Sequence, residues 1–145
     1  MILPDANVLL YAHDKDSGFH PAASKWLESC LSSTAAFGLT WQTIMAFLRI
    51  ATNHRVFVRP LTGPAAMQTV ADWFARPNVT ILTPGQRHWG ILSEMVSRGQ
   101  AYGPLVMDAH LAALAIEHGA VLHTTDRDFS RFPGLRVINP LAPGA

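Results

Sequence analysis

The order of short apolar runs and longer amphipathic segments constrains the fold of this chain more than any other feature. Short apolar runs are typical of buried strands, and they occur at residues 2–3, 37–40, 79–82, 120–122 and 135–138. Helix-like spacing occupies much of the chain between them, at residues 20–31, 41–53, 62–76, 83–99 and 105–118. Strands that alternate with helices pair in parallel. The pattern therefore predicts a three-layer α/β/α architecture around a central, mainly parallel sheet.

Length and composition favour one globular domain over residues 1–145, with 49% hydrophobic and only 14% charged residues. The low charge content suggests that some apolar surface is covered by a partner or a second copy. The single cysteine, Cys30, excludes an internal disulfide and a thiolate metal cluster. There is no apolar run of about 20 residues that could span a bilayer, and no signal peptide is recognisable. A cytoplasmic protein without a membrane partner is expected.

The basic residues are scattered and form no Lys/Arg block, and the formal net charge is only +1. This balance neither requires nor excludes a nucleic-acid partner. If the protein binds RNA, isolated arginines must contact the phosphates. The candidates for such contacts are Arg49, Arg55, Arg59 and Arg127.

Carboxylates occur where strands are predicted to end. Asp5 follows the first apolar residues, Asp126 follows the late apolar run, and Asp108 lies at the start of a helical segment. The carboxyl ends of parallel strands meet at one edge of a sheet, where ligands bind. Acids gathered there would form a site for Mg²⁺ or Mn²⁺, which prefer oxygen ligands. The alternative is that each Asp only caps the turn or helix that follows it.

Several longer segments carry a family resemblance that spans nearly the whole chain. They read LPDANVLLYA, HPAASKWL, WQTIMAFLRIATNHRVF, PLVMDAHLAALAIEHGA and TTDRDFSRFPGLRVINPL. With these motifs the chain resembles PIN domains, and specifically VapC-type toxin ribonucleases of type II toxin–antitoxin systems. The first and last segments are the most specific of the five.

The resemblance implies a PIN-like fold and a Mg²⁺- or Mn²⁺-dependent endoribonuclease that cleaves structured RNA. It also implies a homodimer and a cognate VapB-type antitoxin that neutralises the toxin. The catalytic, metal-binding acids of the family match Asp5, Asp108 and Asp126. Supporting polar positions match Asn7, Thr124 and Thr125, and Asp128 matches a second acid that is either a supporting ligand or a cap.

The chain departs from the family pattern at one position. Many PIN domains have a Glu in the helix that here reads IMAFLRI, and that position is Ala46. The number of metal ions therefore stays open. Two alternatives also stay open: a catalytically weak module that binds RNA or a partner, and a DNA nuclease or phosphatase that uses the same acids.

Overall fold

A five-stranded sheet forms the centre of the molecule. The computed structural model describes residues 1–143. The strands are β1 (Ile2–Pro4), β2 (Phe37–Leu39), β3 (Val79–Ile81), β4 (Val121–His123) and β5 (Val137–Ile138). Their order across the sheet is β3-β2-β1-β4-β5, and each neighbouring pair is parallel. The parallel sheet predicted from the alternating pattern is thus confirmed.

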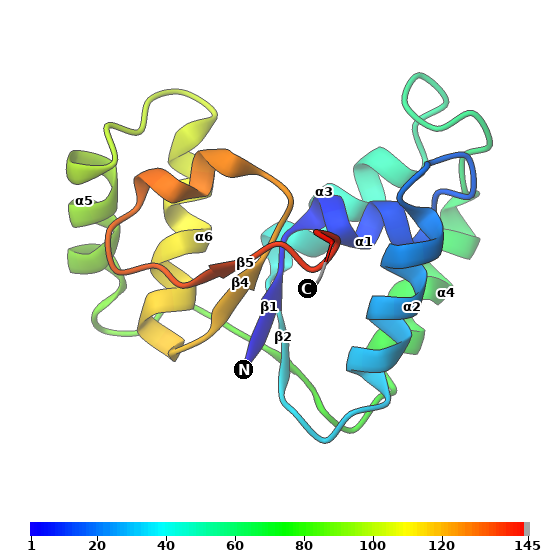
Figure 1. The fold of residues 1–145 in the computed structure, drawn as a ribbon, viewed down its shortest axis with the longest axis horizontal. Coiled ribbons are helices and arrows are strands. Elements are labelled where there is room, and N and C mark those ends of the chain that lie inside the picture. The colour runs from blue at the N-terminus through cyan, green and yellow to red at the C-terminus, as the bar shows by residue number, and fades with distance from the viewer. Residues whose placement is uncertain (144–145) are drawn as a thin grey trace.

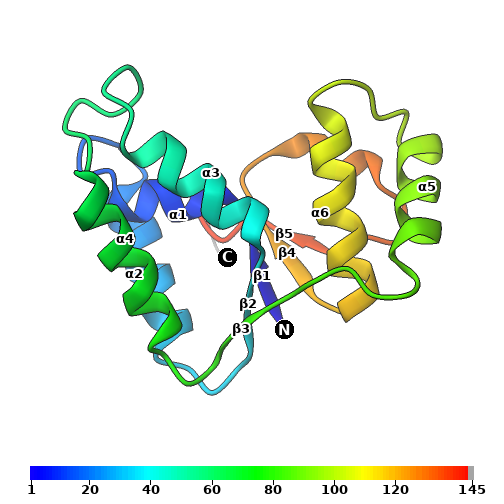
Figure 2. The same cartoon turned by 180° about the vertical axis from the view of Figure 1, so that it is seen from behind.

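Helices cover the sheet on both sides and complete the three layers (Figure 1). One layer contains α1 (Ala6–His13), α2 (His20–Leu31), α3 (Trp41–Ala51) and α4 (Gly63–Phe74). The opposite layer contains α5 (His88–Arg98) and α6 (Leu105–His118), as the reverse view in Figure 2 also shows. Within residues 1–143, none of the helices is both long and apolar enough to cross a bilayer.

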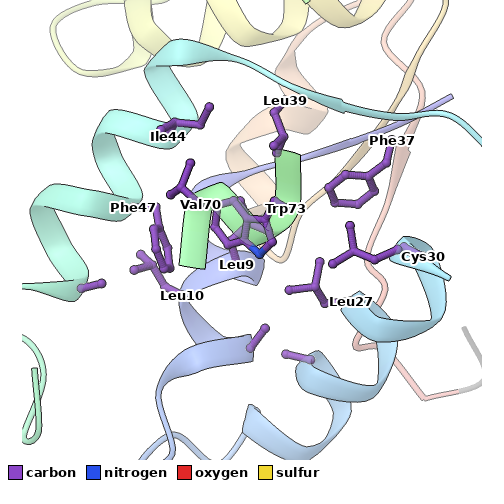
Figure 3. Packing of buried hydrophobic residues seen from close by; sticks show 14 of the residues in the cluster. Leu9, Leu10, Leu27, Cys30, Phe37, Leu39, Ile44, Phe47, Val70 and Trp73 are labelled. Atoms are coloured by element: carbon purple, nitrogen blue, oxygen red, sulfur yellow. The ribbon is translucent and has the colours of Figure 1, made fainter. Parts of the chain in front are cut away.

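Each layer buries its own apolar core against the sheet. Phe37 and Leu39 of β2 point into the first core, where they meet Leu27, Phe47 and Trp73 from the helices (Figure 3). The second core contains Leu3 of β1 and Leu122 of β4, packed with residues of α5 and α6. Because side chains alternate across a strand, one short sheet serves both cores.

Local capping signals explain where several helices begin and end. Thr40 caps α3 by accepting a hydrogen bond from the backbone N of Thr43. Thr62 caps α4 in the same way, accepting from the backbone N of Ala65. Gly119, with φ of 66°, ends α6 in the left-handed conformation that favours glycine. The side-chain oxygens of Thr40 and Thr62 accept from amide groups that a helix start otherwise leaves unpaired.

Several predicted boundaries were wrong, and contacts in the structure explain two of them. The helix predicted from residue 83 begins only at His88, because the Glu117 carboxylate accepts hydrogen bonds from the backbone N of Gly85 (2.8 Å) and of Arg87 (3.0 Å). These contacts hold the segment as a loop. The strand predicted from residue 135 begins at Val137, because Leu135 still belongs to the turn at Gly134 (φ of 82°) and its backbone N donates to the carbonyl of Phe132 (3.4 Å).

Candidate metal centre

The predicted acids lie at the carboxyl edge of the sheet, near its middle. Asp5 directly follows β1, and its backbone N donates to the carbonyl of His123, the last residue of β4 (2.9 Å). Asp126 lies three residues beyond that strand, and Asp108 lies in the first turn of α6. The edge position agrees with the general location of ligand sites in parallel sheets.

Three carboxylates approach one another closely. Asp108, Asp126 and Asp128 each offer one oxygen, and these oxygens lie within 4.8 Å of one another. We call these residues the acid group. Asp126 and Asp128 flank the start of a short 3-10 helix, η1 (Arg127–Arg131), and the backbone N of Asp128 donates to Asp126 Oδ1 (2.8 Å). Asp126 is therefore the cap of this turn as well as a member of the acid group.

Asp5 is joined to the acid group through one hydroxyl. Thr124 Oγ1 donates to Asp5 Oδ2 (2.9 Å) and accepts from the backbone N of Asp126 (3.0 Å). The other oxygen of Asp5 accepts from the backbone N of Ala6 (2.7 Å), so Asp5 also caps α1. Asp5 lies outside the acid group, whose carboxylate oxygens are within 4.8 Å of one another. Asp5 therefore caps α1, as the capping alternative predicts, and it also lies beside the acid group through Thr124.

Burial and like charges alter the titration of these acids. Burial first, and then the charges of Asp126, Asp5 and Asp128, raise the pKa of Asp108 to about 6. Burial also raises the pKa of Asp5, although its hydrogen bonds from Thr124 and Ala6 oppose this effect. Clustered carboxylates repel one another unless a cation compensates them. With only oxygen donors in the acid group, the residues fit a hard divalent cation.

Arg131 stabilises the segment that carries Asp126 and Asp128, a role that was not predicted from the sequence. Its Nε donates to the carbonyl of Asp128 (3.2 Å), and its Nη1 donates to the carbonyl of Gly99 (3.1 Å). The side chain therefore ties η1 to the residue that follows α5. Its charge also opposes the increase in the pKa of Asp108. The only available signal was a basic residue three positions after Asp128.

The other predicted site residues differ in how close they lie to the acids. Thr125 and Arg127 line a cleft of about 330 Å³ together with Asp126, whereas Asn7 is half-buried in the first turn of α1. We call this space the β4–β5 cleft. Its lining residues are Thr124, Thr125, Asp126, Arg127, Ser130, Val137 and Asn139. Arg55 is exposed in the segment after α3.

Ala46 lies in a second cleft, of about 590 Å³, between α3 and the start of α6. Gln42, Met45, Arg49 and Met107 complete its lining, and we call it the α3–α6 cleft. The amide Nε2 of Gln42 donates to the carbonyl of Met107 (3.3 Å) and so links the two helices. No carboxylate lines this cleft within the described residues. A third cleft, of about 220 Å³ between α1, α2 and α4, contains none of the predicted site residues.

A family model for the PIN domain matches residues 2–135. The chain belongs to the PIN-domain family. Over 142 residues, this PIN domain is 44% identical to Ribonuclease VapC37 of Mycobacterium tuberculosis (strain ATCC 25618 / H37Rv), with 98% of this chain and 99% of the relative covered. The resemblance to VapC-type proteins is thereby confirmed.

Solved structures agree with the fold of this PIN domain. The structure of FitAB bound to IR36 DNA fragment superimposes with a TM-score of 0.71 at 19% identity, and 98% of this chain and 96% of that chain are covered. VapBC2 from Rickettsia felis, bound to a DNA fragment from its promoter, gives a TM-score of 0.67 at 15% identity, covering 95% and 98%. At these identities the comparison concerns the fold alone.

Proposed function

We propose that this PIN domain is a VapC-type toxin, a Mg²⁺- or Mn²⁺-dependent endoribonuclease that cleaves structured cellular RNA. The observation that carries the proposal is the acid group, whose oxygens lie within 4.8 Å of one another at the carboxyl edge of the sheet. The 44% identity to a protein named as a ribonuclease supports RNA as the substrate.

In this proposal Asp108, Asp126 and Asp128 hold the divalent ion directly or through waters, together with Asp5. When bound, the ion would lower the pKa of a water molecule and neutralise charge on the phosphate. Thr124 holds Asp5 and the segment around Asp126 in position through its two hydrogen bonds. Because the pKa of Asp108 is raised to about 6, protons and cations compete for its carboxylate. We therefore expect metal affinity to increase between pH 5.5 and 7.5, as the proton leaves.

The assembly and setting are also part of the proposal. A VapB-type antitoxin is supported by the likeness to the VapBC2 complex, and a homodimer by large apolar side chains at the surface. The exposed ones on the helices outside the α3–α6 cleft include Trp41, Met67, Phe74 and Trp89. We place residues 1–145 in a single domain that acts in the cytoplasm, where structured RNA would be available.

The test of the nuclease activity compares three substrates: cellular RNA, single-stranded DNA and a small phosphate ester. Each is incubated with the purified protein in Mg²⁺, Mn²⁺ or EDTA, beside Asp126→Asn and the control Glu94→Gln. Glu94 lies on α5 in an exposed ion pair with Arg98. We expect discrete RNA products that require metal, persist in the control and disappear in Asp126→Asn. Cleavage of DNA or of the ester in place of RNA would contradict the proposal.

A second candidate function is a module that binds RNA or a partner with little catalysis. It is favoured by one observation, namely that Ala46 leaves the α3–α6 cleft without a carboxylate. RNA binding without cleavage by the wild-type protein, together with cleavage by Ala46→Glu, would support this candidate over the first.

A further inference from the structure

Two clefts of different chemistry lie next to the acids: Asp126 lines the β4–β5 cleft, and Met107, the residue before Asp108, lines the α3–α6 cleft. The strand order sets the order of the clefts along the edge. The strands run β2-β1-β4-β5 across this part of the sheet. Helix α3 begins after β2, Asp5 follows β1, Asp126 follows β4 and Asn139 follows β5. The order is therefore α3–α6 cleft, acids, β4–β5 cleft. Three inter-strand spacings of about 4.8 Å make this path about 14 Å long.

The α3–α6 cleft suits the face of a nucleobase. Met45 is 53% exposed and Met107 is 51% exposed, and both line the cleft. Methionine thioethers adapt to planar apolar groups, and Ala46 is small enough to leave the space open. Arg49 is exposed at the same cleft and makes no ion pair within residues 1–143, so it is available to a phosphate. These contacts would be tolerant of base identity, because every base has an apolar face.

The β4–β5 cleft instead offers hydrogen-bonding groups. Within the described chain, the side chains of Thr125, Arg127 and Ser130 make no hydrogen bond to another residue, although all three line this cleft. Asn139 uses its Oδ1 to accept from the backbone N of Leu141 (3.0 Å), which leaves its amide nitrogen unpaired. Unpaired donors and acceptors beside single-stranded RNA can recognise the edges of its bases.

We propose that a single-stranded loop of the structured RNA lies along this edge, with one nucleotide in each cleft and the phosphate between them at the acids. The base in the α3–α6 cleft is held by apolar contact and the base in the β4–β5 cleft by hydrogen bonds. Sequence preference therefore resides in the β4–β5 cleft. This inference rests on the proposed ribonuclease function and identifies which part of the site selects the RNA. Both cleft volumes, about 330 and 590 Å³, lie in the usual range for ligand sites.

The test is cleavage of an RNA pool with a randomised loop, followed by sequencing of the product ends. Ser130→Ala removes a hydroxyl that makes no hydrogen bond within residues 1–143, and Asn139→Asp keeps the acceptor for Leu141 while removing the amide donor. We expect each variant to reduce base preference at one nucleotide beside the cut about ten-fold, the loss of one hydrogen bond. Ala46→Leu, which fills the other cleft, should lower kcat/KM about ten-fold with the preference unchanged.

Two results separate this inference from the function on which it rests. If the wild-type protein cuts RNA but Ser130→Ala and Asn139→Asp keep the wild-type preference, the inference is wrong and the nuclease stands. If the wild-type protein cuts no RNA, the function fails, and affinities for short oligoribonucleotides in EDTA test the inference alone. In that measurement each variant should reduce the base preference at one nucleotide about ten-fold, and an unchanged wild-type preference in both variants would overturn the assignment.

Discussion

Thr124 is only 2% exposed, and its hydroxyl joins Asp5 to the backbone of Asp126. Removal of the hydroxyl leaves the backbone N of Asp126 and Oδ2 of Asp5, which both belong to half-buried residues, without this hydrogen-bond partner. We expect Thr124→Ala to lower the free energy of unfolding by about 1–3 kcal/mol, measured with urea. Thr124→Ser, which keeps the hydroxyl, should retain most of the stability. Equal stability of the wild type and Thr124→Ala would show that these bonds contribute little.

The pKa of Asp108 predicts how stability depends on pH without metal. The pKa rises from 3.8 in the unfolded chain to about 6 in the fold, so between these values the folded carboxyl holds a proton that the unfolded one has lost. Stability from this group is present below about pH 4 and is lost as pH rises through 6. We expect metal-free Asp108→Asn to be more stable than the wild type at pH 7.5, by about 1 kcal/mol after discounting for partial exposure.

The control for that measurement is about pH 2.5, well below the unfolded value of 3.8, where the carboxyl is protonated in both states and the difference between wild type and variant should vanish. A wild type that is more stable than Asp108→Asn at pH 7.5 in EDTA would contradict the assigned pKa.

At single positions, the sequence allowed acids at the ends of predicted elements to be selected, but it did not give the distances between them. Asp108 and Asp126 could be selected because each lies at the start or end of a predicted element. Whether Asp5 or Asp128 completes the closest group depends on how η1 turns, and a spacing pattern does not contain that information. Arg131 acts on backbone carbonyls from two elements, and such contacts have no sequence signature.

Among the elements, α3 contributes most of the residues that line the α3–α6 cleft, and the start of this helix depends on its cap. Thr40 is buried, accepts from the backbone N of Thr43 and donates to its hydroxyl (2.9 Å). We expect Thr40→Ala to lower the unfolding free energy by about 1–2 kcal/mol. Thr62→Ala provides the matched control, because that cap of α4 is exposed, and its effect in the same urea titration should be smaller. A larger loss in Thr62→Ala would contradict the role of burial.

Element boundaries could be predicted where the determining residues are adjacent in sequence. The predicted helices at residues 20–31 and 105–118 agree with α2 and α6, whose ends are marked by Pro21 and Gly119. The start of α5 could not be predicted in this way. It is set by Glu117, which lies 30 or more residues away in sequence and binds the loop that precedes the helix.

For the whole molecule, the exposed apolar side chains and the 14% charged residues predict self-association. We expect sedimentation velocity without antitoxin to give a mass about twice the 15.8 kDa of the chain. Co-expression with a VapB-type partner should give a larger, defined complex. A protein that sediments as a monomer at all accessible concentrations would contradict the proposed homodimer.

If the acid group is a divalent-metal site, as proposed, calorimetric titration of the metal-free protein with Mn²⁺ at pH 7.5 should detect binding there. We expect the wild type and the surface variant Glu94→Gln to bind one or two ions per chain with the same affinity. Asp108→Asn and Asp126→Asn should weaken binding at least about ten-fold, since each removes a charged ligand. Absence of binding in the wild type, or equal binding in all four proteins, would contradict the claim.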